Sequence, residues 1–147
     1  MHRAGAPLEG ARAIGRLTVD GPWIGFGYRA GLPHLVVGAA DGVQDAPADR
    51  DLLLALAIAH FAEAFAEAPP DIAATQSDLS ALVRHLMATE ADVDRRALLG
   101  EATDAIDDGL AGDAVAEKLA AARSPATASV DPVELLLVEA RQLSERA

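Results

Sequence analysis

Residues 23–38, WIGFGYRAGLPHLVVG, decide the fold class because they predict two strands joined by a tight turn. In the first strand Ile24, Phe26 and Tyr28 occupy alternate positions, which is the period of a half-buried strand. The sequence AGLP at 30–33 predicts the turn, because glycine and proline favour turn conformations. A connection this short joins only antiparallel neighbours, so the two strands are expected to form a hairpin.

A further strand is expected before this hairpin, over residues 11–19. There Leu17 alternates with polar neighbours, and the sequence DGP at 20–22 predicts the turn that follows. We therefore predict a three-stranded antiparallel β-meander over residues 11–38. A flexible N-terminus is expected over residues 1–10.

The remainder of the chain is expected to be helical, because the period of its apolar residues changes from 2 to 3.6 after residues 39–48. Those residues carry Gly, Asp and Pro and are expected to form a loop, with Asp45 or Asp49 capping the next helix. The apolar positions of this first helix are expected at Leu54, Ile58, Phe61 and Phe65, before a stop at Pro69 and Pro70.

The second helix has the clearest start signal in the sequence. Thr75 and Asp78 have the spacing of a capping box, in which each residue satisfies a backbone N–H of the other. The apolar residues that follow recur at i, i+3, i+4, i+7 and i+8, the pattern of one buried helix face. They are Leu79, Leu82, Val83, Leu86 and Met87.

Three more helices are expected towards the C-terminus. One runs from about Asp92 to Gly109, a glycine that suits the residue after a helix end, and a short one covers residues 113–123. Residues 124–130 are small and predict a linker. Residues 131–147 predict a C-terminal helix that Asp131 caps.

Together these elements predict one α+β domain over residues 1–147, helix-rich, with a helical core at 49–123 and about five helices. The length of 147 residues fits one domain, and a composition of 51% hydrophobic and 24% charged residues is that of a globular protein.

Several features point to the cytoplasm. The chain has no cysteine, so it has neither disulfides nor thiolate metal sites. The start of the sequence lacks the apolar segment of a signal peptide. The longest apolar stretch, residues 52–62, is about half the length of a membrane helix. We expect no membrane association.

The net charge of −11 is concentrated in the helical part, because the first 40 residues hold four Arg against Glu9 and Asp20. Such a surface repels phosphate backbones, so no direct binding to nucleic acid is expected. A basic protein is the electrostatically favoured partner. Arg far outnumbers Lys and Ala is abundant, which indicates a GC-rich bacterial or phage genome.

Two short motifs resemble ligand-binding loops but lack the context that the ligands require. Residues 25–30 match the letters of a dinucleotide fingerprint, yet another strand rather than a helix follows them. Residues 104–109 resemble a calcium loop, yet the third and twelfth positions of that loop would be Ile106 and Val115, which offer no side-chain oxygen. Neither cofactor is expected.

No catalytic or metal-binding group is visible in the sequence. His60 and His85 could pair with Glu63 or Glu90, but they lack the spacing that directs several ligands at one metal. Every serine falls in a helix or linker rather than on a sharp strand-to-helix turn. Every carboxylate is expected on a solvated face or a cap, where it makes a poor general acid. We therefore favour a non-enzyme without cofactors or metals.

The predicted surface features favour a binding function instead. The aromatic strand has large side chains on both faces, and only one face can pack against the chain's own helices. The acidic end of the third helix would favour a cationic partner. The C-terminal helix carries a wide apolar run at residues 135–138, a possible surface for homo-oligomers. The predicted partner-binding residues are Trp23, Phe26, Tyr28, Asp104, Asp107 and Asp108.

The leading hypothesis is a non-catalytic protein–protein interaction module of the inhibitor, immunity, antitoxin, adaptor or chaperone type, which binds through the aromatic β-surface and the acidic helices. One alternative is a structural subunit of a larger bacterial or phage-like assembly. Another is a small enzyme or ligand-binding regulator with a pocket between the sheet and the first helix.

Overall fold

The computed structural model describes residues 6–39, 42–66 and 68–145, and within them the chain is α+β. A four-stranded antiparallel sheet comes first and five helices follow, so the predicted fold class is confirmed. The first five residues of the predicted flexible N-terminus lie outside the described residues.

The sheet has one strand more than the sequence predicts. Its strands β1 (Glu9–Arg16), β2 (Trp23–Arg29), β3 (Leu32–Ala39) and β4 (Gly42–Pro47) lie side by side in chain order, and every neighbouring pair is antiparallel. β4 lies where a loop was expected. Its Gly, Asp and Pro resemble a loop in sequence, but they are tolerated because β4 is an edge strand and its proline is its last residue.

One face of the sheet packs against the core. The cross-strand pairs Phe26–Leu35 and Ile24–Val37 place four large apolar side chains on this face, each at most 3% exposed. Trp23 pairs with Gly38 instead and therefore lies on the opposite face. The strand with aromatic residues thus has one aromatic side chain on the face away from the core.

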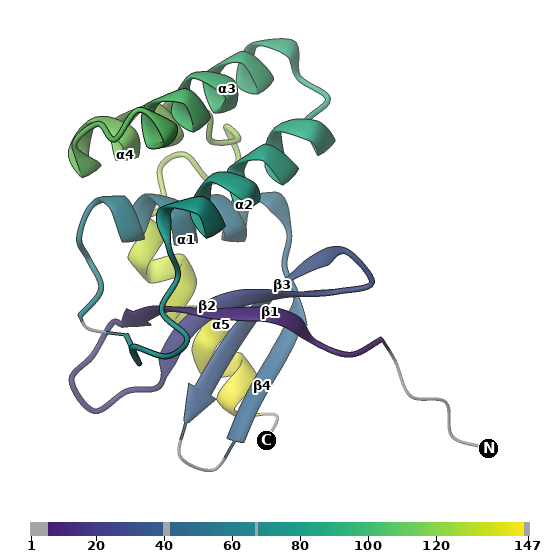
Figure 1. Ribbon diagram of the computed structural model, residues 1–147, viewed down its shortest axis with the longest axis vertical. Coiled ribbons are helices and arrows are strands. Elements are labelled where there is room, and N and C mark those ends of the chain that lie inside the picture. The colour runs from purple at the N-terminus through teal and green to yellow at the C-terminus, as the bar shows by residue number, and fades with distance from the viewer. Residues whose placement is uncertain (1–5, 40–41, 67, 146–147) are drawn as a thin grey trace.

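The first helix, α1 (Arg50–Phe61), is the centre of the molecule. It is capped by Asp49, which accepts a hydrogen bond from the backbone N–H of Leu52 at 2.8 Å. Residues 52–59 are all buried, as expected for a helix enclosed on all sides. Figure 1 shows α1 between the sheet and a layer of three further helices. They are α2 (Gln76–Thr89), α3 (Val93–Asp107) and α4 (Gly112–Ala121).

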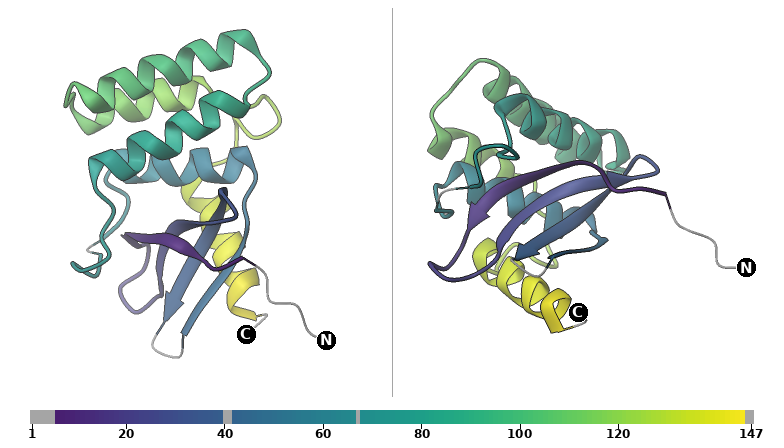
Figure 2. Two further views of the ribbon diagram at one scale, coloured as in Figure 1. Left: turned by 45° about the vertical axis from the view of Figure 1, so that its right-hand side comes forward. Right: turned by 60° about the horizontal axis from the view of Figure 1, so that its bottom comes forward.

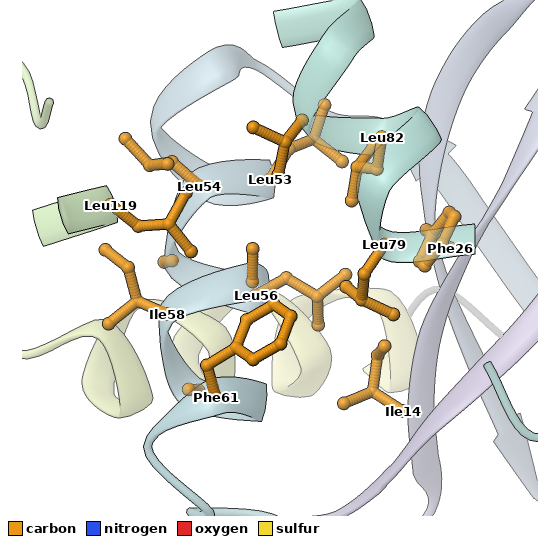
Figure 3. Close-up of a cluster of buried hydrophobic side chains, with 14 of the residues drawn as sticks. Ile14, Phe26, Leu53, Leu54, Leu56, Ile58, Phe61, Leu79, Leu82 and Leu119 are labelled. Carbon is orange, nitrogen blue, oxygen red and sulfur yellow. The ribbon is translucent and has the colours of Figure 1, made fainter. Parts of the chain in front are cut away.

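The buried side chains of the helices and the sheet meet around α1. In Figure 3, Leu54 and Ile58 lie beside Leu119 of α4, while Leu79 of α2 lies beside Phe26 of the sheet. All five residues belong to one buried cluster, so the sheet and the helices share a single core.

α1 ends at Phe61, and the prediction that it continues past Phe65 was wrong. The backbone turns at Glu63, which has a φ of 58°, and the following segment runs along the outer edge of β1. Ala66 and Arg16 exchange two backbone hydrogen bonds there, and Ala13 bonds to the backbone further along the segment. Pairing with the sheet edge therefore outweighs the local helical pattern, which periodicity alone cannot detect.

The predicted starts of α2 and α3 are confirmed. Thr75 accepts from the backbone N–H of Asp78, and the Asp78 side chain accepts from that of Thr75, which completes the capping box. Asp92 caps α3 by accepting from the backbone N–H of Arg95 at 3.0 Å.

The last helix, α5 (Pro132–Glu145), runs from α1 along the sheet, as both views of Figure 2 show. Leu136 is fully buried, Leu135 and Leu137 are partly buried, and Val138 is 46% exposed. Most of the apolar run therefore packs within the chain, and its contribution to a homo-oligomer surface is reduced to Val138. Within the described residues, no helix has the length and apolar character needed to cross a membrane.

Candidate functional site

The predicted aromatic surface is divided between the two faces of the sheet. Phe26 is 1% exposed and belongs to the core, so it cannot contact a partner. Tyr28 lies on the same face with its ring edge-on to Phe26, at a centroid distance of 6.1 Å. Burial, and secondarily the negative charge of Asp78, raises the pKa of Tyr28. Of the three predicted aromatic residues, Trp23 alone remains on the outer face.

The indole ring of Trp23 lies directly over Gly38 on this outer face. A Cβ atom added to Gly38 would lie 2.2 Å from Cε2 of Trp23, so the ring occupies the space of a side chain. Val43 pairs with Gly38 on the other side and is 50% exposed. Trp23, Gly38 and Val43 therefore form one row across three strands, and its apolar side chains face away from the core.

Trp23 also lines a groove of about 510 Å³, which we call the Trp23 groove. It lies between the β1–β2 turn, the end of β3 and the segment after α1. Arg16 stabilises the turn by donating from Nη1 to the carbonyl oxygen of Gly21 at 2.6 Å. The lining residues are Arg16, Asp20, Gly21, Pro22, Trp23, Ala39 and Pro69.

The predicted acidic cluster at the end of α3 is partly engaged within the chain. Asp107 accepts a hydrogen bond from the Ser80 hydroxyl at 2.8 Å and forms an ion pair with Arg84. It therefore fastens α3 to α2. Asp104 and Asp108 are exposed and make no ion pair with any described residue, so these two carboxylates remain available to a partner.

Glu90 contradicts the expectation that every carboxylate is solvated, because its side chain is 2% exposed. Its two carboxylate oxygens are held by Arg50 Nη1 at 3.1 Å and by Arg95 Nε at 2.6 Å. Arg96 donates twice to the Glu90 backbone carbonyl, at 3.0 and 2.7 Å. We call this cluster the Glu90 clamp. It connects the start of α1 to the turn between α2 and α3.

The clamp keeps Glu90 ionised. The hydrogen bond from Arg95 lowers the pKa of Glu90, and the charge of Arg50 adds to this effect. A general acid needs a raised pKa, so this carboxylate is poorly suited to donate a proton near neutral pH. The clamp borders a polar pocket of about 250 Å³, but the observed contacts are those of a structural ion-pair cluster.

A second charged cluster joins three strands. Asp45 of β4 accepts from Arg29 Nε at 2.7 Å and from Nη2 at 2.8 Å, a bidentate pair. It also pairs with His34 Nδ1 at 2.9 Å. The bonds from Arg29 lower the pKa of Asp45. Because an ionised carboxylate only accepts hydrogen bonds, Nδ1 of His34 carries the proton of this bond.

His34 and His85, which the sequence leaves unconnected, line one pocket of about 280 Å³ between the sheet, α1 and α2. Leu53 and Pro33 supply apolar walls. His60 lies apart with its ring edge-on to Phe61, and burial lowers its pKa. No group of three metal-ligating side chains occurs among the residues that the structure describes.

Comparison with known proteins finds no family model, curated protein or solved structure that matches this chain.

Proposed function

We propose that this chain is a protein-binding module whose partner contacts the Trp23 groove. The carrying observation is the position of Trp23 on the outer face, where its ring lies over Gly38 beside the exposed Val43. A tryptophan held in one position loses little side-chain entropy on binding, and tryptophan is enriched among residues that dominate binding energies.

The shape of the groove also supports a protein partner. Pro22 and Pro69 add rigid apolar surface to the groove beside Trp23, while Arg16 and Asp20 supply polar groups. An apolar centre with polar groups at its border is the usual arrangement of a protein interface.

The acidic helices are proposed to guide a basic partner rather than to hold it. Asp104 and Asp108 are exposed, and exposed charges change association rates more than they change dissociation rates. With a net charge of −11, the chain repels acidic partners and attracts basic ones.

The proposal is tested by isolating binding partners from the source cells and measuring their affinity for variants. Trp23→Ala should weaken the complex by about 2 kcal/mol, mainly through faster dissociation. Val93→Ala is the matched control, because Val93 is 73% exposed on α3 and lies outside the groove. Equal affinities of Trp23→Ala and the wild type, with both proteins folded, would refute the groove assignment.

The steering role has a separate test. Reversing the charges of Asp104 and Asp108 together should slow association and reduce its dependence on salt. If the association rate stays unchanged and independent of salt, these carboxylates do not select a basic partner.

A second candidate function is a ligand-binding regulator, which the pocket lined by His34 and His85 favours. The pocket lies between the sheet and α1, and its lining combines apolar residues with two histidines, as small-molecule sites often do. A ligand that saturates the protein and loses affinity in His85→Gln, while Trp23→Ala binds it normally, would favour this function over partner binding.

A further inference from the structure

A fourth hollow lies on the other side of the β1–β2 turn, between that turn and α5, and has a volume of about 220 Å³. We call it the α5 pocket. Leu17 and Ile24 line it from the sheet, and Leu137 and Ala140 line it from the helix. Ile24 is 2% exposed and Ala140 is 6% exposed, so the pocket has a buried apolar floor.

One face of α5 extends from this floor to a polar rim. Leu137, Ala140, Arg141 and Ser144 are spaced i, i+3, i+4 and i+7, so they share one side of the helix. Arg141 and Ser144 are exposed, and the exposed Thr18 faces them from the turn. A ligand with an apolar body and a polar end would match this gradient.

The charge of the rim indicates which polar group a ligand of this pocket would carry. Arg141 makes no ion pair or hydrogen bond with another described residue, whereas five other arginines pair with carboxylates of the chain. A guanidinium group binds carboxylates through two parallel hydrogen bonds, and the hydroxyl of Ser144 offers a further donor. The rim therefore favours a carboxylate over a neutral or cationic group.

We propose that the α5 pocket binds a small organic monocarboxylate with an aliphatic or aromatic body. Its volume of about 220 Å³ is smaller than that of most sites for drug-sized ligands. The apolar body would lie against Ile24 and Ala140, and the carboxylate would contact Arg141. This site shares Pro22 with the Trp23 groove but lies on the other side of the β1–β2 turn, and it does not depend on the proposed partner binding.

The test uses hexanoate as the probe and two matched compounds. Acetate lacks the apolar body, and 1-hexanol lacks the charge. Pro22 and Ile24 both line the pocket and flank Trp23, the one tryptophan of the chain, so its fluorescence provides a titration signal. Amide chemical shifts locate the site independently. Hexanoate should bind at least about tenfold more tightly than either compound, with shifts centred on Leu137, Ala140 and Ile24.

Two exposed substitutions test the pocket without disturbing the core. Arg141→Gln should weaken hexanoate binding about fivefold or more, because it removes the cation. Ser144→Leu should weaken it by extending a side chain across the rim. Arg84→Gln is the matched control, since Arg84 is on α2 and does not line the pocket. No binding of hexanoate, equal binding of 1-hexanol, or unchanged affinity in Arg141→Gln would each overturn the proposal.

Discussion

Gly38 provides the space that the indole ring of Trp23 occupies, with Cε2 of the ring 2.2 Å from where a Cβ atom of residue 38 would be. Gly38→Ala should therefore displace the ring and lower the free energy of unfolding by about 1–3 kcal/mol. The displaced ring should become more solvated, so tryptophan emission should shift to longer wavelengths.

The matched control is the same substitution in a helix. Gly100 lies within α3, and a Cβ atom there would meet only the flexible Met87 Sδ at 3.4 Å. Gly100→Ala should raise stability by about 0.5–1 kcal/mol and leave the emission unchanged. If Gly38→Ala behaves like Gly100→Ala in both measurements, the ring does not rest on Gly38.

The Glu90 clamp should contribute measurably to stability. Glu90→Gln removes the charge that holds Arg50 and Arg95, so at pH 7 it should lower the free energy of unfolding by about 1–3 kcal/mol in urea titrations. Because the pKa of Glu90 is lowered in the folded chain, this contribution is present above the ordinary pKa and is lost as the pH falls. The difference between variant and wild type should therefore shrink in acid.

An exposed ion pair is the comparison for this clamp. Glu101 pairs with Lys118 at 3.8 Å, and its side chain is 60% exposed. Glu101→Gln should change stability by less than about 0.5 kcal/mol. An equally small effect of Glu90→Gln would mean that the buried clamp contributes no more than a surface pair.

His60 should make stability depend on pH between neutrality and mild acid. Burial lowers the pKa of His60 in the folded chain below the ordinary value of 6.5, so the unfolded chain binds more protons in that range. Stability should be complete above about pH 6.5 and decline as the pH falls. His60→Gln should flatten this slope in unfolding measurements from pH 7.5 to 5.5. Parallel curves for the two proteins would contradict the assignment.

The contact between β1 and the segment after α1 depends on Gly15. A Cβ atom at this position would lie 2.2 Å from the carbonyl oxygen of Ala66 and 2.8 Å from Cβ of Phe65. Gly15→Ala should separate the segment from the strand and cost about 1–3 kcal/mol. Hydrogen exchange of the Ala66 amide should accelerate more than that of Leu56 in α1. A uniform change at both amides would indicate global rather than local destabilisation.

The sequence predicts those elements whose signals are local. The reciprocal bonds of Thr75 and Asp78 lie within one turn, so the start of α2 can be predicted from spacing alone. β4 escapes prediction because its strand character comes from pairing with β3 rather than from its own residues. The end of α1 cannot be predicted from local sequence for the same reason, because the backbone partners of Ala66 belong to a strand about 50 residues earlier in the chain.

In the candidate site, too, features with a local sequence signal could be predicted, and features that depend on distant residues could not. Trp23 could be predicted as a surface residue because a strand with bulky residues on both faces must leave one face outside the core. The odd spacing between Trp23 and Phe26 also implies that these two side chains lie on opposite faces, so they could not both contact one partner. Glu90 could not be found from spacing alone, because the Arg50 that helps to bury it comes from another helix. The pairing of His34 with Asp45 likewise depends on the unexpected strand β4.

The segment that covers the outer edge of β1 limits how copies of this chain can aggregate. Exposed strand edges allow sheets to join, and a sheet with two open edges can add copies without end. Here the bridges at Ala66 and Ala73 cover the second half of the outer edge of β1, whereas β4 has no strand partner on its outer side among the described residues. Two copies joined through β4 would leave only their partly covered β1 edges for further strand addition, so the segment after α1 hinders the extension of such a dimer into a fibre.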